Sequence, residues 1–112
     1  MSMVEPTRIL AIRHGETPWN VEFRIQGYTD IALNARGRDQ ALRLGVAVGK
    51  SHDSEPVHAI YSSDLSRAFD TAQAVADNVG LSVTPDLGLR ERTFGIFEGR
   101  PFDEVRQSHP ED

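Results

Sequence analysis

The sequence predicts an α/β fold in which a mostly parallel sheet is flanked by helices. Three short apolar runs have the length of buried strands: Thr7–Ile12, Val57–Tyr61 and Leu81–Thr84. Between them lie two segments with apolar residues at helical spacing, Ala35–Val48 and Leu65–Val79. This alternation of strands and helices is typical of parallel sheets that helices cover.

The residues that flank the two predicted helices support their bounds. Asn34 is suited to cap the first helix, and Ser63 or Asp64 is suited to cap the second. Gly80 is suited to end the second helix, because glycine adopts the left-handed C-cap conformation without steric cost. The expected buried faces are Ala41, Leu44, Gly45 and Val48 on the first helix and Ala68, Ala72, Val75, Ala76 and Val79 on the second.

The C-terminal part of the sequence has weaker patterns. Leu87–Phe97 is expected to be irregular, and Phe102–Ser108 to form a short helix that Pro110 stops. We expect Glu98 to belong to a solvated acidic surface and Trp19 to pack the loop over the core. The Gly45–Ser51 stretch resembles a phosphate-binding loop, but it has one residue too few between its glycines and lies at a helix end.

Composition narrows the classes of function. The 112 residues include 38% hydrophobic and 26% charged residues, and the formal net charge is -5. A negative chain is a poor binder of nucleic acid or anionic membranes, so neither partner is expected. The absence of cysteine excludes disulfides and thiolate chemistry. With no visible signal segment or membrane-spanning run, we expect a cytoplasmic location.

Three polar motifs follow the predicted strands, and each has a plain structural alternative. His14 follows the first strand between Arg13 and Gly15, where it is either a nucleophile beside a phosphate-binding arginine or part of a polar turn. Arg67 lies in the first turn of the second helix, where the helix dipole disfavours a cation. It therefore either binds an anion or pairs on the surface with Asp64 or Asp70. Glu91 is either a general acid or an ion-pair partner.

The order and spacing of four stretches resemble the histidine phosphatase superfamily, also called phosphoglycerate mutase-like. The stretches are RHGETPWN from residue 13, the R-x-QG-x-x-D-x-x-L run at Arg24–Leu33, SSDLSRAFDTA from residue 62, and LRERTFGIFEG from residue 89. The resemblance extends from Ile9 to about Pro110. It implies a phosphoglycerate mutase-like fold and a small phosphorylated metabolite as substrate.

The resemblance also implies roles for single residues. His14 would accept the phosphoryl group as a phosphohistidine, and Glu91 would be the general acid. Arg13 and Arg67 would clamp the phosphoryl oxygens, so no metal is expected. The remaining residues expected to contact phosphate or shape its pocket are Thr17, Asn20, Gln26, Gly27 and Arg92.

One departure from the family concerns a second catalytic histidine, which members carry in a late His-Gly motif. His52, His58 and His109 lack a following glycine, so all three are expected to be surface residues. We therefore expect residues 1–112 to form the N-terminal part of a single histidine phosphatase domain, truncated before the second histidine. Exposed sheet edges in such a part would favour a homodimer.

The likeness leaves three functions open. The Phe23–Tyr28 stretch and Glu91-Arg92-Thr93-Phe94 differ from the motifs of cofactor-dependent mutases, which favours hydrolysis of phosphomonoesters without a cofactor. A phosphoglycerate mutase that needs a 2,3-bisphosphoglycerate primer is the first alternative. The second alternative is a catalytically incompetent module that binds phosphate or assembles with other chains.

Overall fold

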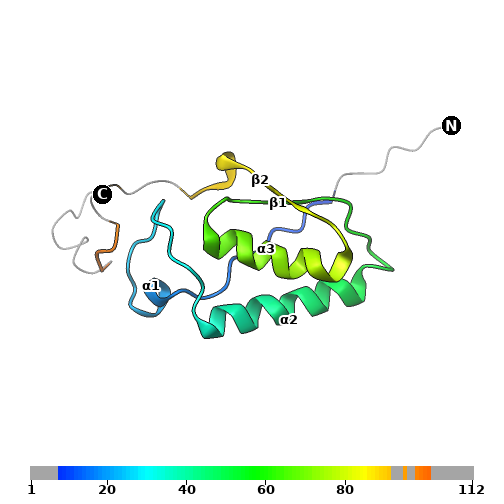
Figure 1. The fold of residues 1–112 in the computed structure, drawn as a ribbon, viewed down its shortest axis with the longest axis horizontal. Coiled ribbons are helices and arrows are strands. Elements are labelled where there is room, and N and C mark those ends of the chain that lie inside the picture. The colour runs from blue at the N-terminus through cyan, green and yellow to red at the C-terminus, as the bar shows by residue number, and fades with distance from the viewer. Residues whose placement is uncertain (1–7, 92–94, 96–97, 102–112) are drawn as a thin grey trace.

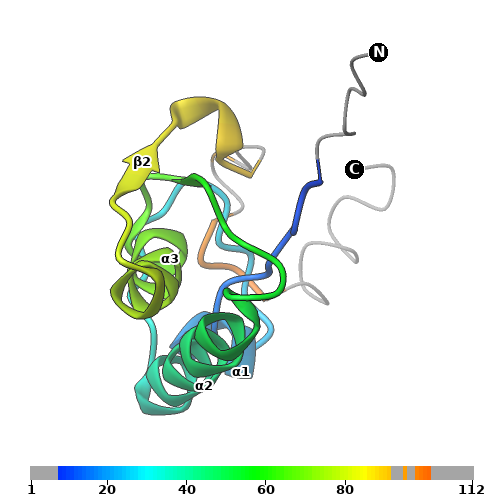
Figure 2. The ribbon, with the colours of Figure 1, turned by 90° about the vertical axis from the view of Figure 1, so that its right-hand side faces the viewer.

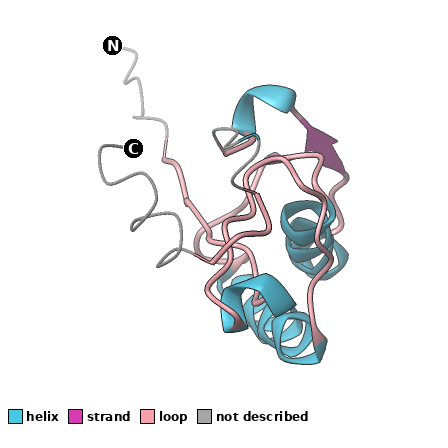
Figure 3. Cartoon of the chain, turned by 90° about the vertical axis from the view of Figure 1, so that its left-hand side faces the viewer, coloured by secondary structure: helices cyan, strands magenta, loops and turns pink. Residues whose placement is uncertain are grey.

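The computed structural model describes residues 8–91, 95 and 98–101. Its elements are α1 (Pro18–Val21), α2 (Ala35–Ser51), β1 (Ile60–Ser62), α3 (Ser66–Val79), β2 (Val83–Pro85) and a 3-10 turn at Leu87–Leu89. α3 lies between the two-stranded sheet and α2 (Figures 1 and 2). Much of the remaining chain is loop, and these loops gather beside the two long helices (Figure 3).

The parallel sheet confirms the predicted α/β class. β1 and β2 pair in parallel, with Ile60 opposite Val83 and Ser62 opposite Pro85. Parallel neighbours need a crossover between them, and α3 supplies it. Both strands begin two or three residues later than the sequence predicts, and the predicted helix at Phe102–Ser108 lies outside the described residues.

The prediction of a buried strand at Thr7–Ile12 is wrong for its described residues. Residues 8–12 form no strand, and Ile9 and Leu10 are 86% and 68% exposed. A strand exists only where its backbone meets a partner, and an apolar run by itself does not supply one. Among the described residues, the sheet consists of β1 and β2, and this segment is not hydrogen-bonded into it.

α2 begins and packs largely as predicted. The side chain of Asn34 accepts a hydrogen bond from the backbone N–H of Gly37 at 2.7 Å, which confirms the predicted cap. Of the expected face, Ala41, Gly45 and Val48 are buried, whereas Leu44 is only half-buried. The helix extends three residues beyond the predicted end, to Ser51.

Small residues let α2 and α3 approach closely. A Cβ placed on Gly45 would lie 2.3 Å from the carbonyl oxygen of Ala74, so only glycine fits there. Ala41 and Ala74 form a buried cluster with Leu33 at this contact. The close approach fixes the position of α3 relative to α2.

α3 ends as predicted but begins differently. Gly80 adopts the left-handed conformation at φ 70°. Of the expected face, Val75 and Ala76 are buried, whereas Ala68, Ala72 and Val79 are only half-buried. The predicted caps Ser63 and Asp64 are wrong, since Leu65 occupies the cap position without a side-chain bond.

The first turn of α3 is capped from a distant loop instead. Asp30 accepts hydrogen bonds from the backbone N–H of Ser66 at 2.7 Å and from its hydroxyl at 3.1 Å. A local sequence pattern indicates only neighbouring residues as caps, whereas Asp30 lies 36 residues upstream of Ser66. Within the described ranges, no helix is long and apolar enough to cross a membrane.

Candidate active site

His14 lies in the extended segment that leads into the α1 turn, and its ring is half-buried. Its Nδ1 is 2.6 Å from the carbonyl oxygen of Gly15. Because a carbonyl oxygen only accepts hydrogen bonds, this contact places a proton on Nδ1 and the lone pair on Nε2. Burial lowers the pKa of His14 below 6.5, and the hydrogen bond to Gly15 opposes this only in part. The ring is therefore neutral at pH 7, as a nucleophile must be.

Charges on three other predicted site residues act on this ring. After burial and the Gly15 hydrogen bond, Arg67 lowers the pKa of His14, Glu91 raises it and Arg13 lowers it. The structure thus brings the four residues that the sequence singled out into one region. Two guanidinium groups beside a neutral imidazole form a place where a phosphate dianion can be held against a nucleophile.

Arg67 is the most deeply buried of these groups, at 1% exposure. Its guanidinium donates to the carbonyl oxygens of Thr29 at 2.7 Å and Gly27 at 2.6 Å, and to the Glu91 carboxylate at 3.3 Å. The alternative of a surface arginine paired with Asp64 or Asp70 is wrong. The two carbonyl acceptors offset the unfavourable interaction between the Arg67 cation and the positive end of the helix dipole. They also fix the orientation of its planar guanidinium group.

Gly15 joins the histidine segment to both long helices. Its backbone N–H donates to the hydroxyl of Thr71 at 3.1 Å, and that hydroxyl donates to the carbonyl of Arg67 at 2.7 Å. A Cβ on Gly15 would lie 2.4 Å from the carbonyl oxygen of Gly37 in the first turn of α2. The position of His14 is therefore tied to the same turn of α3 that carries Arg67.

Three of the predicted phosphate-contact residues form a polar cluster, in which Thr17 and Gln26 are buried and Asn20 is half-buried. Thr17 is fully buried and donates its hydroxyl to the amide oxygen of Gln26 at 2.7 Å. The amide oxygen of Asn20 accepts from the backbone N–H of Thr17 at 3.0 Å, as part of the cap of α1. With its oxygen engaged, each amide offers its N–H₂ group as the donor for a ligand.

Glu98 belongs to this arrangement, so its prediction as a solvated surface acid is wrong. Its carboxylate accepts a hydrogen bond from the backbone N–H of Thr29 at 2.7 Å and another from the Thr29 hydroxyl. It also lies against Gly27, where a Cβ would approach the carboxylate oxygen to 2.5 Å. Glu98 thereby holds the loop whose carbonyls orient Arg67.

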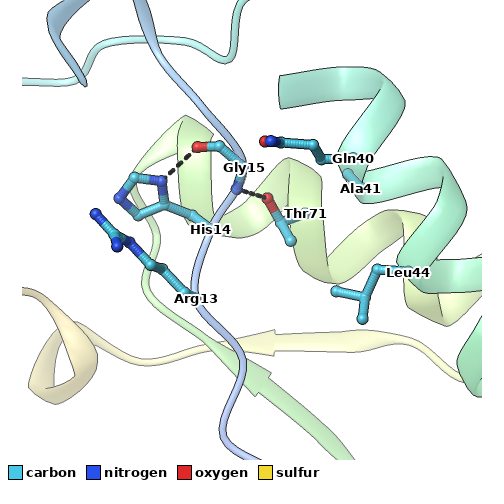
Figure 4. A pocket seen from close by; sticks show the side chains of 7 residues that line it. All are labelled: Arg13, His14, Gly15, Gln40, Ala41, Leu44 and Thr71. Carbon is cyan, nitrogen blue, oxygen red and sulfur yellow. Dashed lines mark hydrogen bonds between the residues drawn. The ribbon is translucent and has the colours of Figure 1, made fainter. Parts of the chain in front are cut away.

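A pocket of about 260 Å³ lies beside the histidine segment. Its lining residues are Arg13, His14, Gly15, Gln40, Ala41, Leu44 and Thr71. Figure 4 shows the side chains of Arg13 and His14 extending together on the side away from α2. Arg92 lies outside the described residues. In the described part of the chain, no three His, Cys, Asp or Glu side chains form a group that could hold a metal ion.

Comparison with known proteins gives a consistent family. A sequence model of the histidine phosphatase superfamily (branch 1) matches residues 9–112. The phosphoglycerate mutase-like protein 4 of Arabidopsis thaliana is 43% identical over 109 residues, which are 96% of this chain and 46% of the plant protein. The chain spans less than half the length of the curated relatives it matches.

Solved structures resemble both the fold and the sequence. A mycobacterial glucosyl-3-phosphoglycerate phosphatase in complex with VO3 has a TM-score of 0.78 and 38% identity, covering 87% of this chain and 44% of the phosphatase. A phosphoserine phosphatase from Entamoeba histolytica, in complex with 3-phosphoglyceric acid, has a TM-score of 0.69 and 40% identity, covering 83% and 44%. These neighbours are enzymes that act on small phosphorylated metabolites.

Proposed function

This chain belongs to the histidine phosphatase superfamily, and from that premise we propose that its protein hydrolyses phosphomonoesters through a phosphohistidine at His14. The observation that carries the proposal is the state of the His14 ring. Its Nδ1 is bound to the Gly15 carbonyl, its pKa is lowered, and two arginines and a glutamate act on it. A substrate phosphate dianion beside these arginines would face the unprotonated Nε2.

In the first step, Nε2 of His14 attacks phosphorus, and the bond between phosphorus and the alcohol oxygen breaks as the new N–P bond forms. Glu91, which acts in this step in its protonated form, gives its proton to the departing alcohol oxygen. Arg13 and Arg67 offset the charge on the phosphoryl oxygens. The N–H₂ groups of Asn20 and Gln26 are suited to add neutral donors.

In the second step, water completes the reaction. Glu91, now a carboxylate, takes a proton from a water molecule whose oxygen forms the new bond to phosphorus. The N–P bond breaks, which releases inorganic phosphate and returns neutral His14. Thr17 and Gly27 are proposed to shape the phosphate site, and Arg92 is proposed as a further phosphate contact. The proposal needs no metal or cofactor.

Trapping the intermediate tests the proposal. The full-length protein is mixed with a labelled aryl phosphate and quenched in alkali, because phosphohistidine is labile in acid. We expect label at His14 in the wild type, and neither label nor turnover in His14→Ala. His58→Ala, which changes an exposed histidine, is the matched control. Undiminished turnover in His14→Ala would remove His14 as the nucleophile.

Phosphoglycerate mutase activity is the second candidate, favoured by the name of the Arabidopsis relative. It would require 2,3-bisphosphoglycerate as a primer. Because Phe23–Tyr28 and the residues after Glu91 depart from mutase motifs, we expect slow or no conversion of 3-phosphoglycerate to 2-phosphoglycerate with the primer present. Fast interconversion without release of inorganic phosphate would reverse the assignment.

A further inference from the structure

Arg90 is held more firmly than the glutamate that follows it. Its Nε and terminal nitrogen donate to the two carboxylate oxygens of Asp64 at 2.6 and 2.5 Å. The ring of Tyr28 lies 5.0 Å from the centre of the guanidinium group, within cation–π distance. A two-pronged ion pair and a stacked ring fix both the position and the plane of the Arg90 side chain.

Two ion pairs connect the same two segments with opposite polarity. The segment that enters α3 contributes the carboxylate of Asp64 and then the guanidinium of Arg67. The segment after Leu89 contributes the guanidinium of Arg90 and then the carboxylate of Glu91. Asp64 binds Arg90, and Arg67 lies 3.3 Å from Glu91. Each ion pair therefore constrains the two backbone segments that carry the residues of the other ion pair.

The two pairs differ in how tightly they hold. The side chain of Glu91 is 60% exposed, and its contact with Arg67 is a single one. The side chains of Arg90 and Asp64 are 26% and 33% exposed, and their contact is double. Burial therefore does not hold Glu91 in place, whereas the adjacent residue is anchored. A partly exposed pair adds little to stability, so its main effect is on geometry.

We infer that Arg90 is a positioning residue, which Asp64 and Tyr28 anchor so that the backbone presents Glu91 beside Arg67 and His14. The inference rests on the proposed function, because it concerns the delivery of a proton by Glu91. A group that must protonate a leaving oxygen has to lie within hydrogen-bond reach of that oxygen. Loss of the anchor would leave Glu91 chemically intact but misplaced.

A series of leaving groups tests the inference in the full-length protein. General acid catalysis matters for poor leaving groups, such as phenolate from phenyl phosphate, and little for good ones, such as 2,4-dinitrophenolate. We expect Arg90→Gln to lower kcat/KM for phenyl phosphate by roughly 10-fold or more and to change that for 2,4-dinitrophenyl phosphate by less than about twofold. Asp64→Asn should reproduce the pattern.

Two further variants complete the experiment. The exchanged pair Asp64→Arg with Arg90→Asp should recover part of the phenyl phosphate activity. Arg43→Gln, which breaks an exposed pair with Asp39 on α2, is the matched control and should leave both rates unchanged. Equal losses for both substrates in Arg90→Gln, or no loss for either, would overturn the positioning role.

Failure of this inference is distinguishable from failure of the proposed function. If the proposed function fails, His14→Ala retains turnover and no phosphohistidine forms in the wild type. If only the inference fails, the wild type forms phosphohistidine at His14 and Arg90→Gln shows the wild-type dependence on leaving group.

Discussion

The carboxylate of Glu98 accepts a hydrogen bond from the backbone N–H of Thr29 at 2.7 Å, across most of the length of the sequence. Thr29 in turn offers its carbonyl oxygen to Arg67 at 2.7 Å. Through Thr29, Glu98 positions one of the carbonyl acceptors that orient the buried guanidinium of Arg67. The direction of the arginine fork thus depends on a contact made near the end of the described chain.

Glu98→Ala should therefore weaken anion binding as well as folding. The variant leaves the N–H and hydroxyl of Thr29 without their charged acceptor, at a cost of about 1–3 kcal/mol in the free energy of unfolding. The affinity for inorganic phosphate, measured by titration calorimetry, should fall together with it. Glu55→Ala, in an exposed turn, is the control. Unchanged phosphate affinity in Glu98→Ala would show that the Thr29 carbonyl keeps its place without the glutamate.

Thr71→Val should destabilise the protein although the two side chains have nearly the same shape. The variant removes the hydroxyl that accepts from the buried N–H of Gly15 and donates to the Arg67 carbonyl. An unpaired buried N–H costs about 1–3 kcal/mol, to be measured by urea denaturation at an unchanged m-value. Thr84→Val, on the exposed face of β2, should have little effect. Equal stability of the two variants would contradict the role of the hydroxyl.

Gly15→Ala should impair both stability and activity. The new Cβ would lie 2.4 Å from the carbonyl oxygen of Gly37, and a backbone atom in the first turn of α2 cannot move aside cheaply. Overpacking of this kind costs about 1–3 kcal/mol and would displace His14. Thermal unfolding and aryl phosphate turnover measure the two effects. Gly88→Ala meets only the side chain of Asp86 at 3.1 Å, so it should be tolerated.

The titration of His14 should be shifted toward acid. Because burial lowers its pKa in the folded protein below 6.5, the unfolded chain binds more protons in the range just below pH 6.5. Stability should accordingly fall as the pH drops through 6.5 toward the lower folded value, and this part of the fall should disappear in His14→Gln. The ring proton resonances of His14, followed by NMR, measure the midpoint directly. A midpoint above 6.5 would contradict the description of the ring.

The sequence predicted what depends on local patterns. The cap at Asn34 and the left-handed end at Gly80 follow from the residues themselves, and both are confirmed. Contacts that depend on the tertiary arrangement could not be predicted from the sequence. The cap of α3 comes from Asp30, and no helical spacing could indicate that residue.

The same limit applies to the candidate site. Motif spacing pointed to His14 and Arg67, and the structure brings them into one region. Motif spacing did not indicate the hydrogen bond between Glu98 and Thr29. In an irregular segment, the sequence around an acidic residue is the same whether that residue is solvated or hydrogen-bonded. The strand predicted around Ile9 is wrong for a different reason. The apolar residues of this segment favour a strand, but they cannot provide the partner strand that it needs.

The hydrogen bond between Gly15 and Thr71 has a kinetic consequence, because it closes a loop that contains all of α2 and β1. Such long closures carry a large entropic cost and form late, whereas helices form from neighbouring residues within microseconds. During refolding, helical circular dichroism should therefore recover before His14 is held in place. Phosphate that binds only the finished site would then stabilise the native state by mass action and slow its unfolding, without accelerating the early formation of helices.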